Sequence, residues 1–400
     1  MNVIVIGGGA SGMTAALTAA RAGHSVRLLE RQNRVGRKLL ATGNGRCNLT
    51  NLHADAAYYH GARADFVRPA LEAFPVSDTL DFFRSLGLLT VAEESGRVYP
   101  LSDQAGSVLD VLRFALLGAL AEVRTDFSVT EIKKNERGFA VSSDTETLEA
   151  DRVIVCCGGK AGGKLGGTGS GYDLLASLGH RVTPLFPALV QIKTDPTFVR
   201  SLKGVRADAA AELMQNGKVI AARSGEVQFT EYGVSGPVIF DLSRAVSTAR
   251  GELTLRLDCL RSLTAEELTA WLRERVAARP ALTLEDLLVG SVHNRLGRTL
   301  LRSAGFSLAA PVSSLKEKDL PRVVAAVKSF TLPVSGTLGF DGAQVTAGGA
   351  DTAQFDPHTL QSTLVSGLYA AGEVLDVDGD CGGYNLQWAW SSGRLAGELR

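Results

Sequence analysis

A glycine-rich turn near the start of the chain constrains its fold more than any other feature. The apolar residues 2–6 run into the sequence GGGASG at 7–12, and an alanine-rich segment follows. The spacing is G-x-G-x-x-G between a predicted strand and a predicted helix, the context in which this pattern indicates a dinucleotide-binding βαβ unit. Gly7 allows the tight turn, Gly9 lets the backbone approach a pyrophosphate, and Gly12 lets the helix pack closely on the strand.

A second predicted strand, residues 25–29, places an acidic side chain at the expected distance from this turn. Glu30 follows that strand directly. An acidic residue about 20 positions beyond the glycines accepts hydrogen bonds from ribose hydroxyls, and its charge disfavours a 2′-phosphate. The helix N-terminus at Ala10 and Ser11 favours the pyrophosphate itself. The bound dinucleotide is therefore NAD or FAD.

The end of the chain favours FAD. Residues 366–373, SGLYAAGE, resemble the late strand of flavoproteins with two dinucleotide-binding domains, in which the terminal acid, here Glu373, or the adjacent backbone meets the ribityl chain and the pyrophosphate. A second glycine pair, Gly382-Gly383, then opens a predicted helix. Free N–H groups in its first turn would point at the pyrimidine edge of a flavin and stabilise the negative charge of the reduced ring. These N–H groups belong to Tyr384, Asn385 and Leu386.

Residues 36–51 form the densest cluster of glycine and hydrogen-bonding side chains. Because the segment follows Glu30 closely, we expect it to cross the pyrophosphate and reach the isoalloxazine, with close backbone approach at Gly43 and Gly45. Arg37 or Lys38 would offset phosphate charge. The alternative is a solvated loop without a ligand. The candidate catalytic residues in this segment are Arg46, Cys47 and Asn48.

A third glycine-rich segment, residues 158–171, admits two interpretations. It is either a second dinucleotide fingerprint, for NADPH, or a loop that closes over FAD or the substrate entrance. We favour the loop, because no second strand ending in a ribose-binding acid or arginine follows at the required distance. The full set of expected cofactor-binding residues is Gly7, Gly9, Ala10, Ser11, Gly12, Glu30, Arg31, Arg37, Lys38, Thr42, Gly43, Gly45, Gly158, Gly372, Glu373, Gly383, Tyr384, Asn385 and Leu386.

Composition excludes several classes of protein. The formal net charge is zero, so nothing global demands nucleic acid or an acidic membrane. No stretch approaches about 18 uninterrupted apolar residues, and we expect a soluble, cytoplasmic protein with no membrane partner. The five cysteines form no C-x-x-C pair and no zinc-ligand spacing, which argues against dithiol reductases and against a metal site.

The pattern of elements predicts a discontinuous α/β fold. Strand and helix signals alternate at first, and around Pro184 they give way to short strands separated by turns. The capping box at Thr264 to Glu267 opens a helix, and helical periodicity then continues to residue 330. We expect a Rossmann-type domain at 1–189 and 346–400, an inserted antiparallel β-barrel at 190–262 and 331–345, and a helical subdomain at 263–330.

The segment FTEYGVSGP at 229–237 interrupts the inserted domain. Glu231 and Tyr232 either reach the flavin as acid or base or belong to a structural turn, and the sequence leaves both open. We interpret the six scattered histidines as structural or solvated.

Five motifs together make the chain similar to the BaiN/YhiN-like flavoproteins, also called aminoacetone-oxidase-type FAD-binding enzymes. The motifs are GGGASG at 7–12, GRKLLATGNGRCNLTN at 36–51, FTEYGVSGP at 229–237, VTAGGAD at 345–351 and GLYAAGEVLDVDGDCGGYNLQWAWSSG at 367–393. The resemblance spans the whole chain. It implies a glutathione-reductase-type FAD-binding Rossmann domain with an inserted antiparallel barrel that carries a small helical piece. It also implies that Arg46, Cys47 and Asn48 lie near the flavin ring.

Members of this family have been assigned to amine oxidation, to reduction of activated C=C bonds and to reduction of uridine in ribosomal RNA. The main hypothesis is an FAD-dependent oxidoreductase that passes hydride to an electron-poor C=C bond of a small molecule, with transiently bound NAD(P)H as donor. The first alternative is an enzyme that makes dihydrouridine in ribosomal RNA, using arginines of the helical piece. An amine oxidase and a non-catalytic flavin-binding protein are further alternatives. The oligomeric state stays open.

Overall fold

The computed structural model describes the chain from Met1 to Arg400, except for the side chain of Ala64, and it divides into two compact units. The first unit consists of Met1–Pro187 and Phe340–Arg400, and the second consists of Ala188–Gly339. Each unit has its own apolar core. The second unit is therefore one insertion in the chain of the first. The assignment of residues 263–330 as a separate subdomain stays a prediction.

The first unit is built on a five-stranded parallel sheet with the strand order β20-β11-β1-β2-β7. In β1, Ile6 lies opposite Leu29 on one side and Val155 on the other. A parallel sheet is covered on both faces, which explains why β1 and β11 are continuous apolar runs rather than alternating ones. The strands are β1 (Asn2–Ile6), β2 (Ser25–Leu29), β7 (Glu122–Arg124), β11 (Arg152–Val155) and β20 (Leu368–Ala370).

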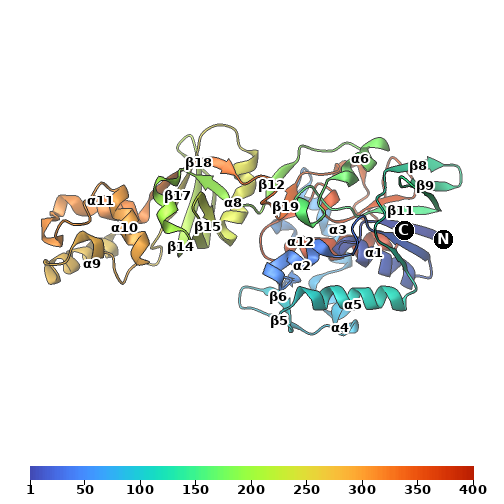
Figure 1. The fold of residues 1–400 in the computed structure, drawn as a ribbon, viewed down its shortest axis with the longest axis horizontal. Helices are drawn as coiled ribbons and strands as arrows, with labels where there is room; N and C mark the ends of the chain where they lie inside the picture. Colours follow the sequence, from blue (N-terminus) through green and yellow to red (C-terminus); the bar gives the residue numbers. More distant parts are fainter. The chain divides into compact units, whose positions relative to one another are not determined.

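Smaller sheets and helices complete the first unit (Figure 1). An antiparallel layer contains β8 (Glu131–Asn135), β9 (Gly138–Ser142) and β10 (Thr147–Ala150). A second small sheet contains β3 (Thr50–Asn51), β5 (Thr90–Ala92) and β6 (Arg97–Pro100), and two pairs join β4 (Tyr59–His60) to β21 (Asp378–Gly379) and β12 (Phe186–Ala188) to β19 (Val345–Ala347). The helices are α1 (Ala10–Arg21), α2 (Arg37–Ala41), α3 (Arg68–Ala73), α4 (Val76–Ser85), α5 (Ala105–Gly118), α6 (Ser170–Ser177) and α12 (Tyr384–Gly397).

The turn from β1 into α1 has no room for side chains at two of its glycines. A Cβ on Gly7, whose φ is +107°, would lie 2.4 Å from the carbonyl oxygen of Cys156. A Cβ on Gly12 would lie 1.8 Å from the carbonyl oxygen of Gly7. Both approaches are far inside van der Waals contact, so the tight turn and the close packing of α1 on the sheet require glycine.

The second unit contains a closed antiparallel barrel with the strand order β13-β16-β15-β14-β17-β18. Closure removes the exposed edges that an open sheet of this size would leave. Burial alternates along β17, as expected for a strand with one face inside a barrel. The strands are β13 (Ile192–Thr194), β14 (Arg206–Gln215), β15 (Lys218–Phe229), β16 (Gly233–Ser235), β17 (Leu253–Asp258) and β18 (Phe330–Thr337).

Five helices accompany the barrel in the second unit. Figure 1 shows α9, α10 and α11 grouped beyond the barrel strands β14 and β17. The capping box predicted at the start of α9 is present, since the Thr264 side chain accepts from the Glu267 N–H and the Glu267 side chain accepts from the Thr264 N–H. The helices are α7 (Pro196–Val199), α8 (Pro237–Thr248), α9 (Ala265–Ala278), α10 (Asn294–Ser303) and α11 (Leu320–Lys328).

The predicted α/β class with an inserted antiparallel barrel is confirmed, and three details differ. Where the sequence predicts only short strands separated by turns, residues 218–229 form one long strand, β15. In the predicted barrel segment 331–345, β18 ends at Thr337 and the next strand, β19, begins only at Val345. Helix α8 was not predicted. No helix among the described residues combines the length and the apolar character needed to cross a membrane.

A buried hydrogen-bond network around Gln387 connects α12 to neighbouring elements of the first unit. Gln387 accepts from the Thr50 hydroxyl at 2.5 Å and donates to the Thr79 hydroxyl at 2.8 Å and to the Phe74 carbonyl at 3.2 Å. Gln387, Thr50 and Thr79 are all fully buried. The network therefore connects α12 to β3, to α4 and to the end of α3 without access to water.

Replacing Gln387 with leucine should lower the free energy of unfolding by about 1–3 kcal/mol, because the Thr50 and Thr79 hydroxyls would lose a buried partner. Urea denaturation followed by tryptophan fluorescence measures the change. The matched control is Gln104→Leu, since the Gln104 side chain is exposed and makes no cap hydrogen bond, and it should stay within about 0.5 kcal/mol of the wild type. Equal losses in the two variants would contradict the network's role.

Candidate cofactor-binding and active site

The N-terminus of α1 has the features of a phosphate site. Gly9 caps the helix without a side-chain hydrogen bond, and no acidic residue stands in the first turn. Nothing lies within 4 Å of the point where a Cβ on Gly9 would be. The first N–H groups of a helix have no intrahelical partner and favour an anion. Ala10, Ser11 and Gly12 therefore present their amides beside open space over Gly9.

Glu30 lies at the end of β2 beside this turn. One carboxylate oxygen accepts from the Gly8 N–H at 2.8 Å, and the other accepts from the Gln32 N–H at 2.7 Å. Each carboxylate oxygen has a further lone pair, so these two hydrogen bonds orient the group without exhausting it. Glu30 is thus held next to the glycine turn, where the sequence predicts a ribose.

The glycine-rich segment 158–171 contacts residues that follow β2. Arg31 donates to the Gly166 carbonyl at 3.1 Å, and Arg37 donates to the Lys164 carbonyl at 3.2 Å and also to the Gln32 side chain. This contact favours the interpretation in which residues 158–171 close over one dinucleotide. Gly158, with φ of +69°, has nothing within 4 Å of its Cβ position, so the backbone there is open to a ligand.

An ion pair joins the two ends of the sequence in the first unit. The Lys38 ammonium donates to Glu373 at 2.5 Å, across 335 positions of the chain. The second Glu373 oxygen accepts from the Thr346 N–H at 2.9 Å. Gly372 lies close to α1, since its Cβ would be 2.5 Å from the Ser11 hydroxyl. The early and late motifs therefore meet at the N-terminal end of α1.

The N-terminus of α12 also lacks a side-chain cap. Gly383 caps it with φ of +103°, and a Cβ there would lie 2.4 Å from the Thr50 carbonyl oxygen. The Asn385 side chain binds both backbone groups of Gly379, accepting at 2.8 Å and donating at 2.7 Å. The Asn385 side chain thus fixes the turn that leads into the helix. The backbone N–H groups of Asn385 and Leu386 belong to the first turn of α12.

The loop of residues 42–48 lies against this helix start. Thr42–Gly45 forms a short turn in which Gly43 and Asn44 are left-handed, and a Cβ on Gly43 would lie 2.8 Å from the Asn48 N–H nitrogen. The Thr42 hydroxyl donates to the Leu39 carbonyl at 2.6 Å. Asn48 Oδ1 is buried and has no hydrogen-bond partner among the described residues. An orphaned buried acceptor beside α12 is what a bound hydrogen-bonding ring would satisfy.

The three predicted catalytic residues have different surroundings. Arg46 pairs with Asp103 and, at 3.3 Å, with Glu93, and its guanidinium stacks over the Tyr99 ring at 4.0 Å. The hydrogen bond that Arg46 donates to Asp103 raises the pKa of Arg46 above its usual value. The positive charge of Arg46 is thus already balanced by two carboxylates.

Cys47 is fully buried, with φ of +60°. Burial raises the pKa of the Cys47 thiol to about 12, against a smaller opposite effect of the Thr42 hydroxyl. The group is therefore a neutral thiol throughout the physiological range, and only a thiolate is a strong nucleophile. These properties argue for a packing role.

The sequence analysis does not predict one polar pair, His60 and Asp380. His60 Nε2 lies 2.6 Å from Asp380 Oδ1, with the two side chains 33 % and 13 % exposed. The pair forms where β4 meets β21, and β21 leads into the glycines before α12. Since 320 positions separate the two residues, no local motif could reveal them. An imidazole hydrogen-bonded to a carboxylate is a pair that can pass a proton to or from a bound substrate.

Glu231 and Tyr232 lie in the second unit, in the turn between β15 and β16. Lys203 donates to Glu231 at 2.9 Å, and this hydrogen bond lowers the pKa of Glu231 below its usual value. Glu231 is therefore a paired carboxylate and a weak candidate for a general acid.

These features define a class of protein in which FAD is bound by a Rossmann-type domain. The residues present fit this cofactor. The uncapped N-terminus of α1 suits its phosphates, and Glu30 beside the glycine turn suits a ribose. The uncapped N-terminus of α12 and the unpaired Asn48 oxygen suit the polar edge of its ring. The chain belongs to the HI0933-like protein Rossmann domain family, whose model matches residues 1–399. It is an FAD-dependent oxidoreductase.

Curated relatives are similar to this chain over nearly its whole length. A 3-dehydro-bile acid delta(4,6)-reductase of Clostridium scindens is 42 % identical over 405 residues, which cover 99 % of this chain and 98 % of that protein. A ribosomal RNA dihydrouridine synthase of Escherichia coli is 29 % identical over 393 residues, covering 98 % and 96 %. Among solved structures, a 3-ketosteroid-delta4-(5alpha)-dehydrogenase of Rhodococcus jostii matches 99 % of this chain and 96 % of its own, with 14 % identity and a TM-score of 0.49.

Replacing Gly383 with alanine should weaken FAD binding at least about tenfold, because the new methyl group would displace the N-terminus of α12 from the Thr50 carbonyl. Flavin released from purified protein and titration of the apoprotein measure the change. The control is Gly179→Ala, which has a similar φ of +91° but nothing within 4 Å of its Cβ position. Gly179→Ala introduces the same positive-φ strain but no steric clash, so this variant should bind FAD like the wild type. Wild-type FAD affinity in Gly383→Ala would refute the assignment.

Cys47 should resist alkylation in the folded protein. With its pKa raised to about 12, the thiol stays protonated and buried at pH values near 8, so iodoacetamide should not modify it. Peptide mass spectrometry after treatment of native protein measures the modification, and the same treatment in guanidinium shows that the peptide can be labelled. Rapid native labelling of Cys47 would show a reactive thiolate and would return it to the catalytic candidates.

Proposed function

We propose that this protein reduces an electron-poor C=C bond conjugated to a carbonyl group in a small organic molecule. The observation that carries the proposal is the 42 % identity, over 99 % of the chain, to a protein named as a 3-dehydro-bile acid delta(4,6)-reductase. The absence of a C-x-x-C pair from the sequence supports direct transfer to the substrate rather than relay through a dithiol.

Different residues of the first unit would bind different parts of FAD. The α1 N-terminus would hold the pyrophosphate, Glu30 would hold a ribose, and Lys38, paired with Glu373, would lie beside the phosphates. Asn48 and the first turn of α12 would hold the polar edge of the ring. When bound and reduced, FAD supplies a hydride at N5, and the partial positive charge of a helix N-terminus favours the negative charge of the reduced ring.

The reduction balances when hydride adds to the β-carbon of the C=C bond and a proton adds to the α-carbon. His60, hydrogen-bonded to Asp380, is the candidate proton donor of the first unit. NAD(P)H would then return two electrons to the flavin. We propose that NAD(P)H binds transiently, because the sequence predicts no second dinucleotide domain.

The alternative substrate, uridine in ribosomal RNA, has support from the 29 % identical relative. The helical piece argues against it. Arg273 pairs with Glu317, Arg298 pairs with Glu285 at 3.1 Å, and Arg295 donates to backbone carbonyls of Ser201 and Lys203. Ion pairs with carboxylates offset the charges of Arg273 and Arg298 and leave less positive charge on the helical piece for phosphate contacts. The geometry therefore favours a small molecule.

The test uses purified holoprotein under anaerobic conditions. NADPH or NADH should bleach the visible absorption band of the flavin, and an α,β-unsaturated ketosteroid should then restore it within seconds. The saturated ketone of the same steroid is the control and should leave the flavin reduced. Reoxidation by unmodified ribosomal RNA but not by the enone would overturn the proposal in favour of the RNA substrate. Peroxide release with simple amines would favour an amine oxidase.

A further inference from the structure

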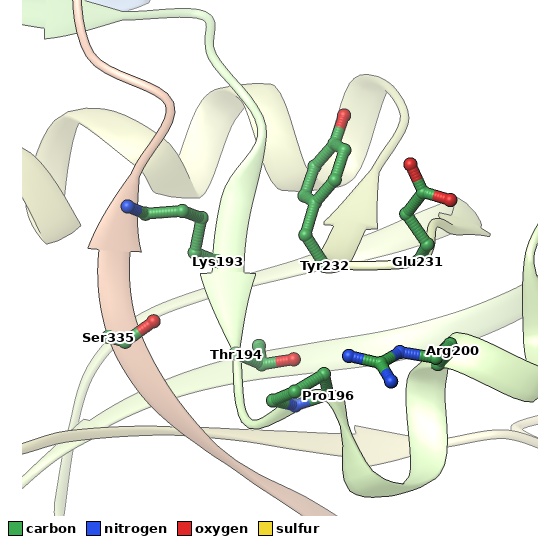
Figure 2. A pocket seen from close by; sticks show the side chains of 7 residues that line it. All are labelled: Lys193, Thr194, Pro196, Arg200, Glu231, Tyr232 and Ser335. Carbon is green, nitrogen blue, oxygen red and sulfur yellow. The ribbon is translucent and has the colours of Figure 1, made fainter.

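The pocket of the second unit does not gather its charged side chains at one point. It has a volume of about 510 Å³, and Lys193, Arg200 and Glu231 are among its lining residues. Figure 2 shows Lys193 directed over β18 and Arg200 on the other side of β13, beside the Glu231 carboxylate. The two cations therefore do not converge on one anionic group.

Arg97 in the first unit is a cationic side chain that no carboxylate neutralises. It is half-buried on β6, and among the described residues its guanidinium takes part in no ion pair and no side-chain hydrogen bond. Two carboxylates of neighbouring segments are engaged elsewhere. Glu93 pairs with Arg46 at 3.3 Å. Asp380 lies 2.6 Å from His60. The positive charge of Arg97 therefore remains available to a ligand.

The side chain of Arg97 lies at the glycine pair that precedes α12. Arg97 Nε is 3.6 Å from the point where a Cβ on Gly382 would be, and Asn51 Nδ2 is 3.5 Å from the same point. Asn51 is fixed there, because it donates to the Gly382 carbonyl at 2.9 Å. A Cβ on the next residue, Gly383, would lie 3.0 Å from Asn48 Oδ1, the buried acceptor without a partner. The unpaired cation and the unpaired acceptor thus flank one turn.

Strand β6 also contacts the other segment that we assign to the polar edge of the ring. Arg97 and Tyr99 are two positions apart on this strand, so they point to the same face of it. The Tyr99 ring is 3.4 Å from the point where a Cβ on Gly43 would be, in the loop of residues 42–48. One face of β6 therefore lies against this loop and against the turn before α12.

A positive charge at this place acts on reduction because reduction changes the charge of the ring. Oxidised flavin is neutral, and fully reduced flavin carries a negative charge at its pyrimidine edge near neutral pH. A nearby cation stabilises the charged form more than the neutral one. The N-terminus of α12 contributes only a partial charge, whereas an arginine contributes a full charge at every physiological pH.

We propose that Arg97 raises the reduction potential of the bound FAD by placing its unneutralised charge beside the polar edge of the ring. The proposal rests on FAD binding in the first unit and goes beyond the proposed function, because it does not depend on which substrate the reduced flavin meets. Arg46, whose charge is balanced by Glu93 and Asp103, has no comparable effect on the ring.

The experiment measures the two-electron reduction potential of the purified holoprotein without substrate, by slow anaerobic reduction in the presence of a reference dye. Arg97→Gln should shift the equilibrium between oxidised and reduced FAD about tenfold toward the oxidised form, which lowers the potential by about 30 mV. Arg97→Lys keeps the charge and should shift the equilibrium less than about threefold.

The matched control is Arg137→Gln. Arg137 is an exposed arginine without an ion pair, in the turn between β8 and β9 of the same unit, and Figure 1 shows this hairpin on the opposite side of the unit from β6. Its charge is screened by solvent, so the variant should have the potential of the wild type.

A second neutral variant and a binding measurement separate the charge of Arg97 from its packing. Arg97→Met should lower the potential as Arg97→Gln does, and both should bind oxidised FAD within about threefold of the wild type, because the oxidised ring is neutral. A wild-type potential in both neutral variants, an equal shift in Arg97→Lys or Arg137→Gln, or loss of oxidised FAD from both neutral variants would overturn the proposal. Because no enone or RNA is present, this result is independent of the enone test, and either proposal can fail alone.

Discussion

The first unit depends on the close approach of α12 to α1. A Cβ on Gly393 would lie 2.4 Å from the Ser11 carbonyl oxygen, and one on Gly397 would lie 2.6 Å from that of Ala15. Glycines four positions apart lie on one face of a helix and let two backbones meet without intervening side chains. This contact brings the last motif of the sequence next to the first, so that the early and late glycine motifs lie in one unit.

The insertion is tolerated because it closes on itself. The barrel leaves no open strand edges, and its core is separate from that of the first unit. The chain passes between the units at Pro187/Ala188 and at Gly339/Phe340. A unit with its own core can be placed between two strands of a parent fold without changing the parent's sheet. The parallel sheet of the first unit therefore keeps its strand β20, which follows the insertion in the chain.

Local chemistry made some features predictable and others not. The glycine turn and the α9 capping box are signals of a few adjacent residues, and the structure has both. Helix α8 was missed because FTEYGVSGP was interpreted only as a turn, although Gly236-Pro237 places proline at the first helical position, where it is favoured. The His60–Asp380 pair could not be found locally, since the pairing of β4 with β21 alone brings it together.

The candidate site also shows how similar residue types acquire different roles from their surroundings. Arg46 and Lys193 are both cationic side chains, but Arg46 contacts two acids and an aromatic ring, whereas Lys193 forms no ion pair within the described chain. The charge of Arg46 therefore holds Glu93 and Asp103 to the loop of residues 42–48. Glu30 and Glu231 differ in the same way: backbone amides fix Glu30 beside the glycine turn, and a lysine pairs with Glu231. Partner geometry, which the sequence does not contain, decides which charges remain available to a ligand.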